Sequence, residues 1–529
     1  MKKIDKRKMF LVIIIILILL VIALFVGKFT FSYLAPDVDE DVNSKGEVTA
    51  SGDTIIFNSG TALTLSATTD NFKTGGTNLT STTNPTAKLV ASSKTNKADS
   101  TYYVGVYIKN NTYTYSTTAK TPEILLTIKD EKGNNVTSVD GLTYTTSGGV
   151  SGFDVTDKTG LFNVKKDYPI TTTSSTTGTI HTWTFTLTFI NLSTDQSVNE
   201  NANMNIDVYL QKNGKFPASV TDVCSGGETL ASCVTMLSKK SIGPVTNIYY
   251  HDSTLTNGAG DNSYRYAGAN PNNFVCFGTN TTPCPTDNLY RIIGVFDGKV
   301  KLIKYDYATS ALLGTDGDYY GTGTPDSSYY KGSLTTVNTY HWNKSTKKNT
   351  WSESELNKTN LNTNFITNIG TEWAQKIAMT TWKVGGNTWA NIGTQPAKTA
   401  YQNEIVSPVT TNTTDGATEC SAKIGLMYAS DYGFAAAQSA WTSNLFNYNG
   451  EAIKNANWMY MGFYEWTISR NADNSNIAFY VYYTGLVHNY YVDSHDVNYI
   501  SGVRPSFNLL SSTTYVSGSG SASDPMIIN

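Results

Sequence analysis

Charged side chains are scarce in this 529-residue chain. Only 15% of the residues are Asp, Glu, Lys or Arg, and 39 basic against 42 acidic residues leave a net charge of −3. Proteins bind nucleic acids mainly through Lys and Arg side chains that neutralise phosphates. The balance of charge therefore argues against nucleic acid as a partner.

Histidine and cysteine are also rare, with five residues of each type. The histidines are scattered at positions 181, 251, 341, 488 and 495, and no two cysteines have the short gap of paired zinc ligands. No metal site is expected.

Short catalytic motifs are missing as well. The chain has no His-Glu-x-x-His, no phosphate-binding glycine-rich loop and no Gly-x-Ser-x-Gly. Ser151 comes nearest to the last motif, but Phe153 stands where its second glycine is needed. Neither a catalytic residue nor a cofactor is predicted. Glu419, Glu451 and Glu465 keep a glycan-processing enzyme open as an alternative, because glycosidases use pairs of carboxylates.

One long apolar run lies near the N-terminus. Residues 9–27 carry no charge, and five Lys or Arg precede them within residues 1–8. A helix of this length is about 28 Å long, which matches the hydrocarbon thickness of a bilayer. We predict a transmembrane helix with residues 1–8 in the cytoplasm and an acidic stalk over residues 28–44 outside. A cleaved signal peptide is disfavoured, since no small-x-small pair follows the run.

Residues 45–212 show the two-residue period of β-strands. Thr182–Phe189 alternates polar and apolar side chains, and three more strand-like runs lie at residues 102–109, 123–129 and 204–210. Several short strands with few helical patterns predict two packed antiparallel sheets of immunoglobulin-like size. We interpret this region as a β-sandwich spacer domain.

The second half of the chain has a different composition. Eight of the nine tryptophans lie between Trp342 and Trp466, which indicates a separate α+β domain over residues 264–529. Residues 213–263 are interpreted as a connector. Asp297-Gly298 between two apolar runs predicts a β-hairpin. Arg504 is expected to be a structural ion-pair partner.

The cysteines suggest disulfides, since an exported chain meets an oxidising environment. Cys224 with Cys233 and Cys276 with Cys284 are the pairs closest in sequence, and Cys420 is left over. Other pairings and free thiols stay open at this point.

A run rich in Tyr, Asn, His, Asp and Ser covers residues 471–499. These residue types are typical of binding loops, because Tyr offers a large contact area with a polar tip and the others offer adaptable hydrogen bonds. On the strand over residues 478–483, one face is predicted to be core and the other to meet a partner. The predicted ligand-binding residues are Tyr480, Tyr482, His488, Tyr490, Tyr491, Asp493, His495, Asp496 and Tyr499.

Four segments of the second half together resemble an uncharacterised domain of anchored surface proteins from low-GC Gram-positive bacteria. They are YRIIGVFDGKVKLIK (290–304), KIGLMYASDYGFA (423–435), YEWTISR (464–470) and SGVRPSFNLL (501–510). That domain is itself similar to the C-type lectin-like and sulfatase-modifying folds, which close with a Gly-x-Arg strand, here Gly502 to Arg504. The resemblance implies a C-type lectin-like fold for residues 264–529 but no activity. The Glu-Pro-Asn and Gln-Pro-Asp triplets of calcium-dependent sugar binders are absent.

The sequence thus predicts a mainly β protein: one N-terminal transmembrane helix, an immunoglobulin-like sandwich and a C-type lectin-like α+β domain. We expect a single-pass membrane protein with its C-terminal part outside the cell, acting as an adhesin for a host or cell-wall glycan or protein. A structural surface component without a specific ligand is the main alternative.

Overall fold

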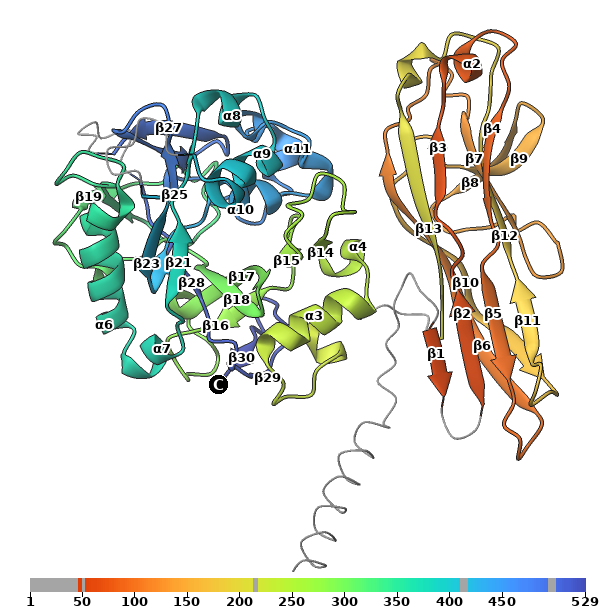
Figure 1. The fold of residues 1–529 in the computed structure, drawn as a ribbon, viewed down its shortest axis with the longest axis horizontal. Helices are drawn as coiled ribbons and strands as arrows, with labels where there is room; N and C mark the ends of the chain where they lie inside the picture. Colours follow the sequence, from red (N-terminus) through yellow and green to blue (C-terminus); the bar gives the residue numbers. More distant parts are fainter. Residues whose placement is uncertain (1–45, 50–52, 213–216, 410–416, 493–500) are drawn as a thin grey trace, which may run out of the picture. The chain divides into compact units, whose positions relative to one another are not determined.

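The computed structural model describes residues 46–49, 53–212, 217–409, 417–492 and 501–529 (Figure 1). The chain divides into two compact units, Met1–Lys215 and Phe216–Asn529. The structure is mainly β, with 36% strand and 18% helix, which confirms the predicted class. The predicted membrane helix (9–27) and stalk (28–44) lie outside the described residues. Within the described ranges, no helix is long and apolar enough to cross a membrane.

The described part of the first unit builds three antiparallel sheets. Their strand orders are β1-β2-β5-β11, β10-β6-β13-β3 and β4-β12-β7-β9-β8. The strands are β1 (Gly46–Thr49), β2 (Thr54–Asn58), β3 (Leu63–Ser66), β4 (Leu79–Thr83), β5 (Thr86–Val90), β6 (Ala98–Asn111), β7 (Ile124–Lys129), β8 (Thr143–Ser147), β9 (Val150–Asp154), β10 (Gly160–Thr172), β11 (Thr179–Thr182), β12 (Thr184–Phe189) and β13 (Asn203–Gln211). Two short helices, α2 (Thr69–Phe72) and η1 (Ser197–Asn199), accompany them.

One hydrophobic core joins the three sheets of this unit. The predicted alternation is visible in the first part of β12, where the buried Phe185 and Leu187 alternate with the half-buried Thr184 and Thr186. Trp183 is fully buried, and its indole N–H donates to the Tyr102 hydroxyl at 2.8 Å. A large aromatic side chain is thereby buried without leaving its polar atom unpaired.

The second unit is organised around a seven-stranded sheet in its described part. The order is β14-β15-β17-β18-β28-β24, with β16 paired to β17. Its strands are β14 (Ile248–His251), β15 (Ser263–Tyr266), β16 (Phe274–Cys276), β17 (Leu289–Phe296), β18 (Lys299–Lys304), β24 (Ile424–Gly425) and β28 (Ser506–Asn508). A four-stranded sheet consists of β22 (Gly386–Asn387), β25 (Glu465–Asn471), β26 (Ile477–Val481) and β27 (Val487–Tyr491). Three strand pairs complete the unit: β19 (Tyr319–Gly323) with β20 (Val337–Tyr340), β21 (Thr380–Lys383) with β23 (Glu419–Ala422), and β29 (Tyr515–Ser517) with β30 (Ile527–Ile528).

Short helices surround these sheets, and α8 to α11 gather at the end of the unit where β27 lies (Figure 1). The α-helices are α3 (Leu230–Lys240), α4 (Gly243–Thr246), α5 (Ser310–Leu313), α6 (Ile366–Asn368), α7 (Thr371–Gln375), α8 (Trp389–Gly393), α9 (Ala397–Tyr401), α10 (Ala429–Phe434) and α11 (Glu451–Lys454). The others are η2 (Val220–Asp222), η3 (Thr286–Asn288), η4 (Trp351–Glu353), η5 (Leu356–Phe365), η6 (Gln402–Val406), η7 (Gln438–Ala440) and η8 (Leu445–Asn447).

The segment interpreted as a connector, residues 213–263, belongs in its described part to the second unit. Leu230, Val234 and Leu237 share one face of α3 and are buried in the core of that unit. β14 forms the edge of its main sheet. The connector interpretation is corrected accordingly, because these residues bury apolar side chains in the same core as the strands that follow.

Two disulfides lie in the second unit. Cys224 is joined to Cys233, and Cys276 to Cys284, while Cys420 is free. The first disulfide ties the residues before α3 to the helix itself.

The predicted hairpin is present as β17 and β18. Asp297 and Gly298 form its turn with φ of 48° and 73°, the left-handed backbone that a two-residue turn of this kind requires.

Candidate functional site

The described members of the predicted ligand-binding set differ in their exposure. Asp493, His495, Asp496 and Tyr499 lie outside the described residues. Tyr491 is 50% exposed at the end of β27, and Tyr482, His488 and Tyr490 are half-buried.

Tyr480 lies in the interior, with only 1% of its surface exposed. It is paired across β25 with Trp466 and across β27 with His488, and its ring contacts both of these rings. Because β26 is flanked by two strands and covered on both faces, the prediction of an open face does not hold for Tyr480. This side chain supports the sheet and is not available to a ligand.

Three aromatic rings form a cluster at the β27 side of this sheet. Trp389 of α8 lies 4.8 Å from the His488 ring and 5.3 Å from the Phe446 ring of η8. The Phe446 and His488 rings are 6.0 Å apart. Trp389 is 38% exposed, and Phe446 and His488 are half-buried. We call Trp389, Phe446 and His488 the aromatic platform.

Local structure fixes the orientation of the platform. The Thr388 side chain caps α8 by accepting a hydrogen bond from the Asn391 N–H. The His488 Nδ1 lies 2.9 Å from the Asn489 carbonyl oxygen. Since a carbonyl oxygen can only accept, Nδ1 is the donor of this hydrogen bond.

Further rings continue from the platform across the unit. His488 contacts Tyr480, which contacts Tyr482; Tyr482 contacts Tyr483, and Tyr483 contacts Tyr329. Tyr482, Tyr483 and Tyr329 are half-buried. The buried Tyr480 ring therefore separates the aromatic platform from the half-buried rings of Tyr482, Tyr483 and Tyr329.

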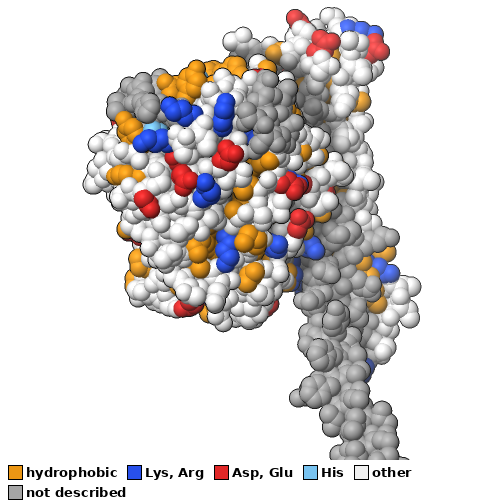
Figure 2. All heavy atoms as spheres, turned by 60° about the vertical axis from the view of Figure 1, so that its left-hand side comes forward, with side chains coloured by type: hydrophobic (Ala, Val, Ile, Leu, Met, Phe, Trp, Pro, Cys, Tyr) orange, Lys and Arg blue, Asp and Glu red, His pale blue; other side chains and the backbone are white. Residues whose placement is uncertain are grey.

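Neutral polar residues stand beside the platform residues in the sequence. Figure 2 shows one face of the molecule, on which hydrophobic and charged side chains stand among white atoms of the backbone and of the remaining side chains. Beside the platform in sequence stand Thr388, Asn391 and Asn447, which are neutral. The arrangement combines flat apolar rings with amide and hydroxyl groups.

Sequence reasoning missed Trp389 and Phe446. They come from two short helices about 40 to 100 residues before His488 in the chain, and only the fold brings the three rings together. The local capping pattern predicts a helix start at Thr388, but nothing in it indicates which rings α8 meets.

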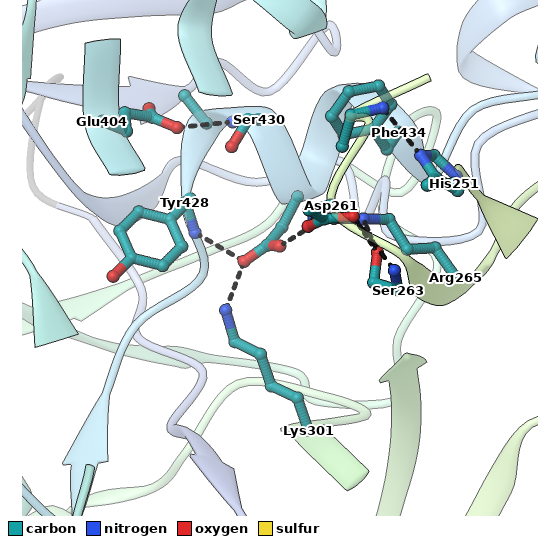
Figure 3. A network of polar contacts seen from close by, with 12 residues as sticks. His251, Asp261, Ser263, Arg265, Lys301, Glu404, Tyr428, Ser430 and Phe434 are labelled. Carbon is teal, nitrogen blue, oxygen red and sulfur yellow. Dashed lines mark hydrogen bonds and ion pairs between the residues drawn. The ribbon is translucent and has the colours of Figure 1, made fainter. Parts of the chain in front are cut away.

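A network of charged residues is buried beneath the main sheet (Figure 3). The Asp431 carboxylate accepts from Lys301 Nζ at 2.6 Å and from Arg265 at 3.3 Å, and the Tyr428 N–H donates to it. Arg265 also pairs with Asp261 at 2.6 Å. Burial lowers the pKa of Lys301, and the attraction of Asp431 opposes this shift.

Glu404 lies beside this network and is completely buried. It accepts hydrogen bonds from the Ser430 N–H and from the Ser469 hydroxyl. Burial raises the pKa of Glu404 to about 7. A perturbed carboxyl of this kind is a feature of catalytic sites, but it is equally produced by structural burial. Because Asp431 and Glu404 are both inside the core with their oxygens engaged, we assign them a structural role.

The three glutamates considered for glycan processing are engaged separately. Glu419 pairs with Lys383 and Glu451 with Lys454 at the surface, whereas Glu465 is buried against Arg504. Among the described residues, one group has metal-ligand spacing, Cys224, Glu228 and Cys233. Its two sulfurs are joined in a disulfide and offer no thiolate.

Comparison with known proteins gives no relatives: no family model, no curated protein and no solved structure matches the chain.

Proposed function

We propose that this chain is a membrane-anchored extracellular surface protein that binds a ligand through the aromatic platform. In this proposal residues 9–27 span the membrane, the first unit is an immunoglobulin-like spacer, and the second is a C-type lectin-like domain. The observation that carries the proposal is the position of Trp389, partly exposed and in contact with Phe446 and His488.

Two features support an extracellular location. The uncharged run over residues 9–27 follows a basic start, as in a helix that keeps its N-terminus in the cytoplasm. The disulfides Cys224–Cys233 and Cys276–Cys284 lie in the part of the chain that would be exported, and such bonds persist in oxidising compartments.

The chemistry of the platform favours a glycan over a charged polymer. Aromatic rings pack against the apolar C–H face of a sugar ring. The Nε2 atom of His488 is left for a hydrogen bond with a sugar hydroxyl, which can both donate and accept, and the neighbouring Thr388, Asn391 and Asn447 are uncharged. Large aromatic side chains at the centre of an interface also supply most of the binding energy.

Binding of the ectodomain, residues 45–529, to immobilised glycans, mucins and matrix proteins tests the proposal. The wild type is expected to bind at least one glycan saturably. A Trp389→Ala/His488→Ala variant is expected to lose this binding while its circular dichroism spectrum stays unchanged.

Tyr250→Ala serves as the matched control. Tyr250 is 39% exposed, close to the 38% of Trp389, and stacks on Tyr264 with ring centroids 4.6 Å apart. The control variant is expected to bind like the wild type. If the ectodomain bound a matrix protein but no glycan, the proposed ligand would be a protein instead of a glycan. Absence of all binding would favour a structural surface component and reject the proposal.

A further inference from the structure

A small pocket opens beside β17 and β18, away from the residues of the aromatic platform. Its volume is about 200 Å³, less than the about 300 to 1,000 Å³ of pockets for drug-sized ligands. Its lining includes Asp287, Tyr290, Lys304, Ala311, Asn368 and Ile369. Asp287, Ala311 and Asn368 are exposed, whereas Tyr290, Lys304 and Ile369 are buried. The exposed residues mark the mouth and the buried ones the floor.

Lys304 is the unusual residue of the floor. Its side chain is 1% exposed, yet within the described part of the chain its ammonium group has no hydrogen-bond or ion-pair partner. A buried ammonium without a counter-charge is strongly disfavoured, so proteins normally pair it. Burial lowers the pKa of Lys304, against the attraction of Asp287 and Asp306.

The charged groups near Lys304 do not supply that partner. The Asp306 carboxylate already accepts hydrogen bonds from the Tyr330 hydroxyl and the Ser333 N–H. Arg504, which repels Lys304, is paired with Glu465. Asp287 is exposed at the mouth, where water screens its charge.

A second donor stands next to Lys304. Tyr290 is its direct cross-strand partner in the β17–β18 pair, so both side chains lie on the same face of the sheet. The Tyr290 side chain is 2% exposed, and among the described residues its hydroxyl has no hydrogen-bond partner. The floor of the pocket thus presents one ammonium and one hydroxyl donor.

We propose that this pocket binds the carboxylate of a small ligand, with Lys304 Nζ and the Tyr290 hydroxyl as its two donors. Two donors match the two oxygens of a carboxylate. A single positive charge balances a monoanion, and the carboxylates of Asp287 and Asp306 repel a phosphate dianion about twice as strongly as a monoanion. The volume limits the bound part to a small organic acid or to the acidic end of a larger molecule.

Titration of propionate into the detergent-solubilised full-length chain, followed by calorimetry, tests this proposal. Saturable binding is expected for the wild type. Lys304→Met is expected to bind at least about tenfold more weakly, since a hydrogen bond to a charged group contributes about that factor or more. Tyr290→Phe is expected to weaken binding to a lesser extent. Asp287→Asn is expected to strengthen it, because a negative charge is removed from the mouth.

Lys299→Met is the matched control, since Lys299 is a half-buried lysine at the other end of β18. It is expected to bind propionate like the wild type. Tyr290→Phe keeps the proposal testable if Lys304→Met does not fold. Any one of three results would overturn the assignment. The wild type does not bind propionate saturably, Lys304→Met binds it with unchanged affinity, or inorganic phosphate binds more tightly than propionate.

Discussion

Among single residues, a few buried ion pairs stand out in the otherwise hydrophobic interior of the second unit. Arg504 Nε donates to Glu465 Oε1 at 2.7 Å, and both side chains are almost completely buried. The sequence interpretation of Arg504 as a structural ion-pair residue is therefore confirmed. Arg504 also donates to the Met459 carbonyl, so it joins the strand β25 to a loop and to the C-terminal segment.

Replacing Arg504 is expected to be severely destabilising. Arg504→Met leaves the buried Glu465 carboxylate without its counter-charge, and loss of one member of a buried ion pair costs about 3 to 5 kcal/mol. Urea unfolding monitored by tryptophan fluorescence measures this change. Lys383→Met, which breaks the surface pair with Glu419, is expected to cost less than about 1 kcal/mol. Equal effects of the two substitutions would contradict this account.

The raised pKa of Glu404 predicts that the free energy of unfolding depends on pH. Its pKa is about 7 in the folded chain because of burial, whereas an unfolded glutamate titrates near about 4.3. The folded state holds the proton more tightly, so this contribution is fully present below about pH 4.3 and is lost as the pH rises through about 7. Between pH 5 and 8 the loss amounts to about 2 to 3 kcal/mol.

Denaturant unfolding of Glu404→Gln at several pH values checks this prediction. The side chain of the variant stays neutral at every pH. As the pH rises from 5 to 8, the free energy of unfolding is therefore expected to fall less for the variant than for the wild type. Glu353→Gln, at an exposed position, is expected to follow the wild type at every pH. If the free energy of unfolding changed with pH in the same way for Glu404→Gln and for the wild type, Glu404 would be ionised in the folded protein and the prediction would be wrong.

At the scale of elements, the β17–β18 turn offers a test of backbone conformation. Gly298 has a φ of 73°, and a Cβ added there would meet no atom within 4 Å. Gly298→Ala is therefore expected to cost about 1 to 2 kcal/mol through the left-handed backbone alone. Gly321, in β19, has equally open space without a positive φ, and Gly321→Ala is expected to change stability by less than about 0.5 kcal/mol. Thermal unfolding of both variants compares the cost of a Cβ on a left-handed backbone with its cost on an ordinary strand backbone.

Local patterns predicted strands better than they predicted exposure. The alternation in Thr182–Phe189 and the Asp297-Gly298 turn correspond to β12 and to the β17–β18 hairpin, because both signals arise within one segment. The burial of Tyr480 depends instead on the strands beside it and on rings from other segments. The platform was equally inaccessible to sequence reasoning, since Trp389 lies about 100 residues before His488.

At the scale of the whole molecule, the two units have separate hydrophobic cores. One core contains residues between Ile55 and Leu210, and the other contains residues between Val220 and Ile528. A unit with its own core is expected to fold alone. A fragment of residues 217–529 is therefore expected to unfold cooperatively, with both disulfides formed. A fragment of residues 264–529 lacks α3 and β14 and is expected to lose the cooperative transition. Cooperative unfolding of the shorter fragment would restore the connector interpretation.

The proposed function depends on the aromatic platform as the site that binds an extracellular ligand. The most direct measurement is the dissociation constant of the ectodomain for its best-binding glycan, compared between Trp389→Ala and Tyr250→Ala. These two side chains are exposed to the same degree. The account predicts a loss of at least about tenfold for Trp389→Ala, as for a central aromatic contact, and no change for Tyr250→Ala. Equal affinity of the two variants would contradict the claim.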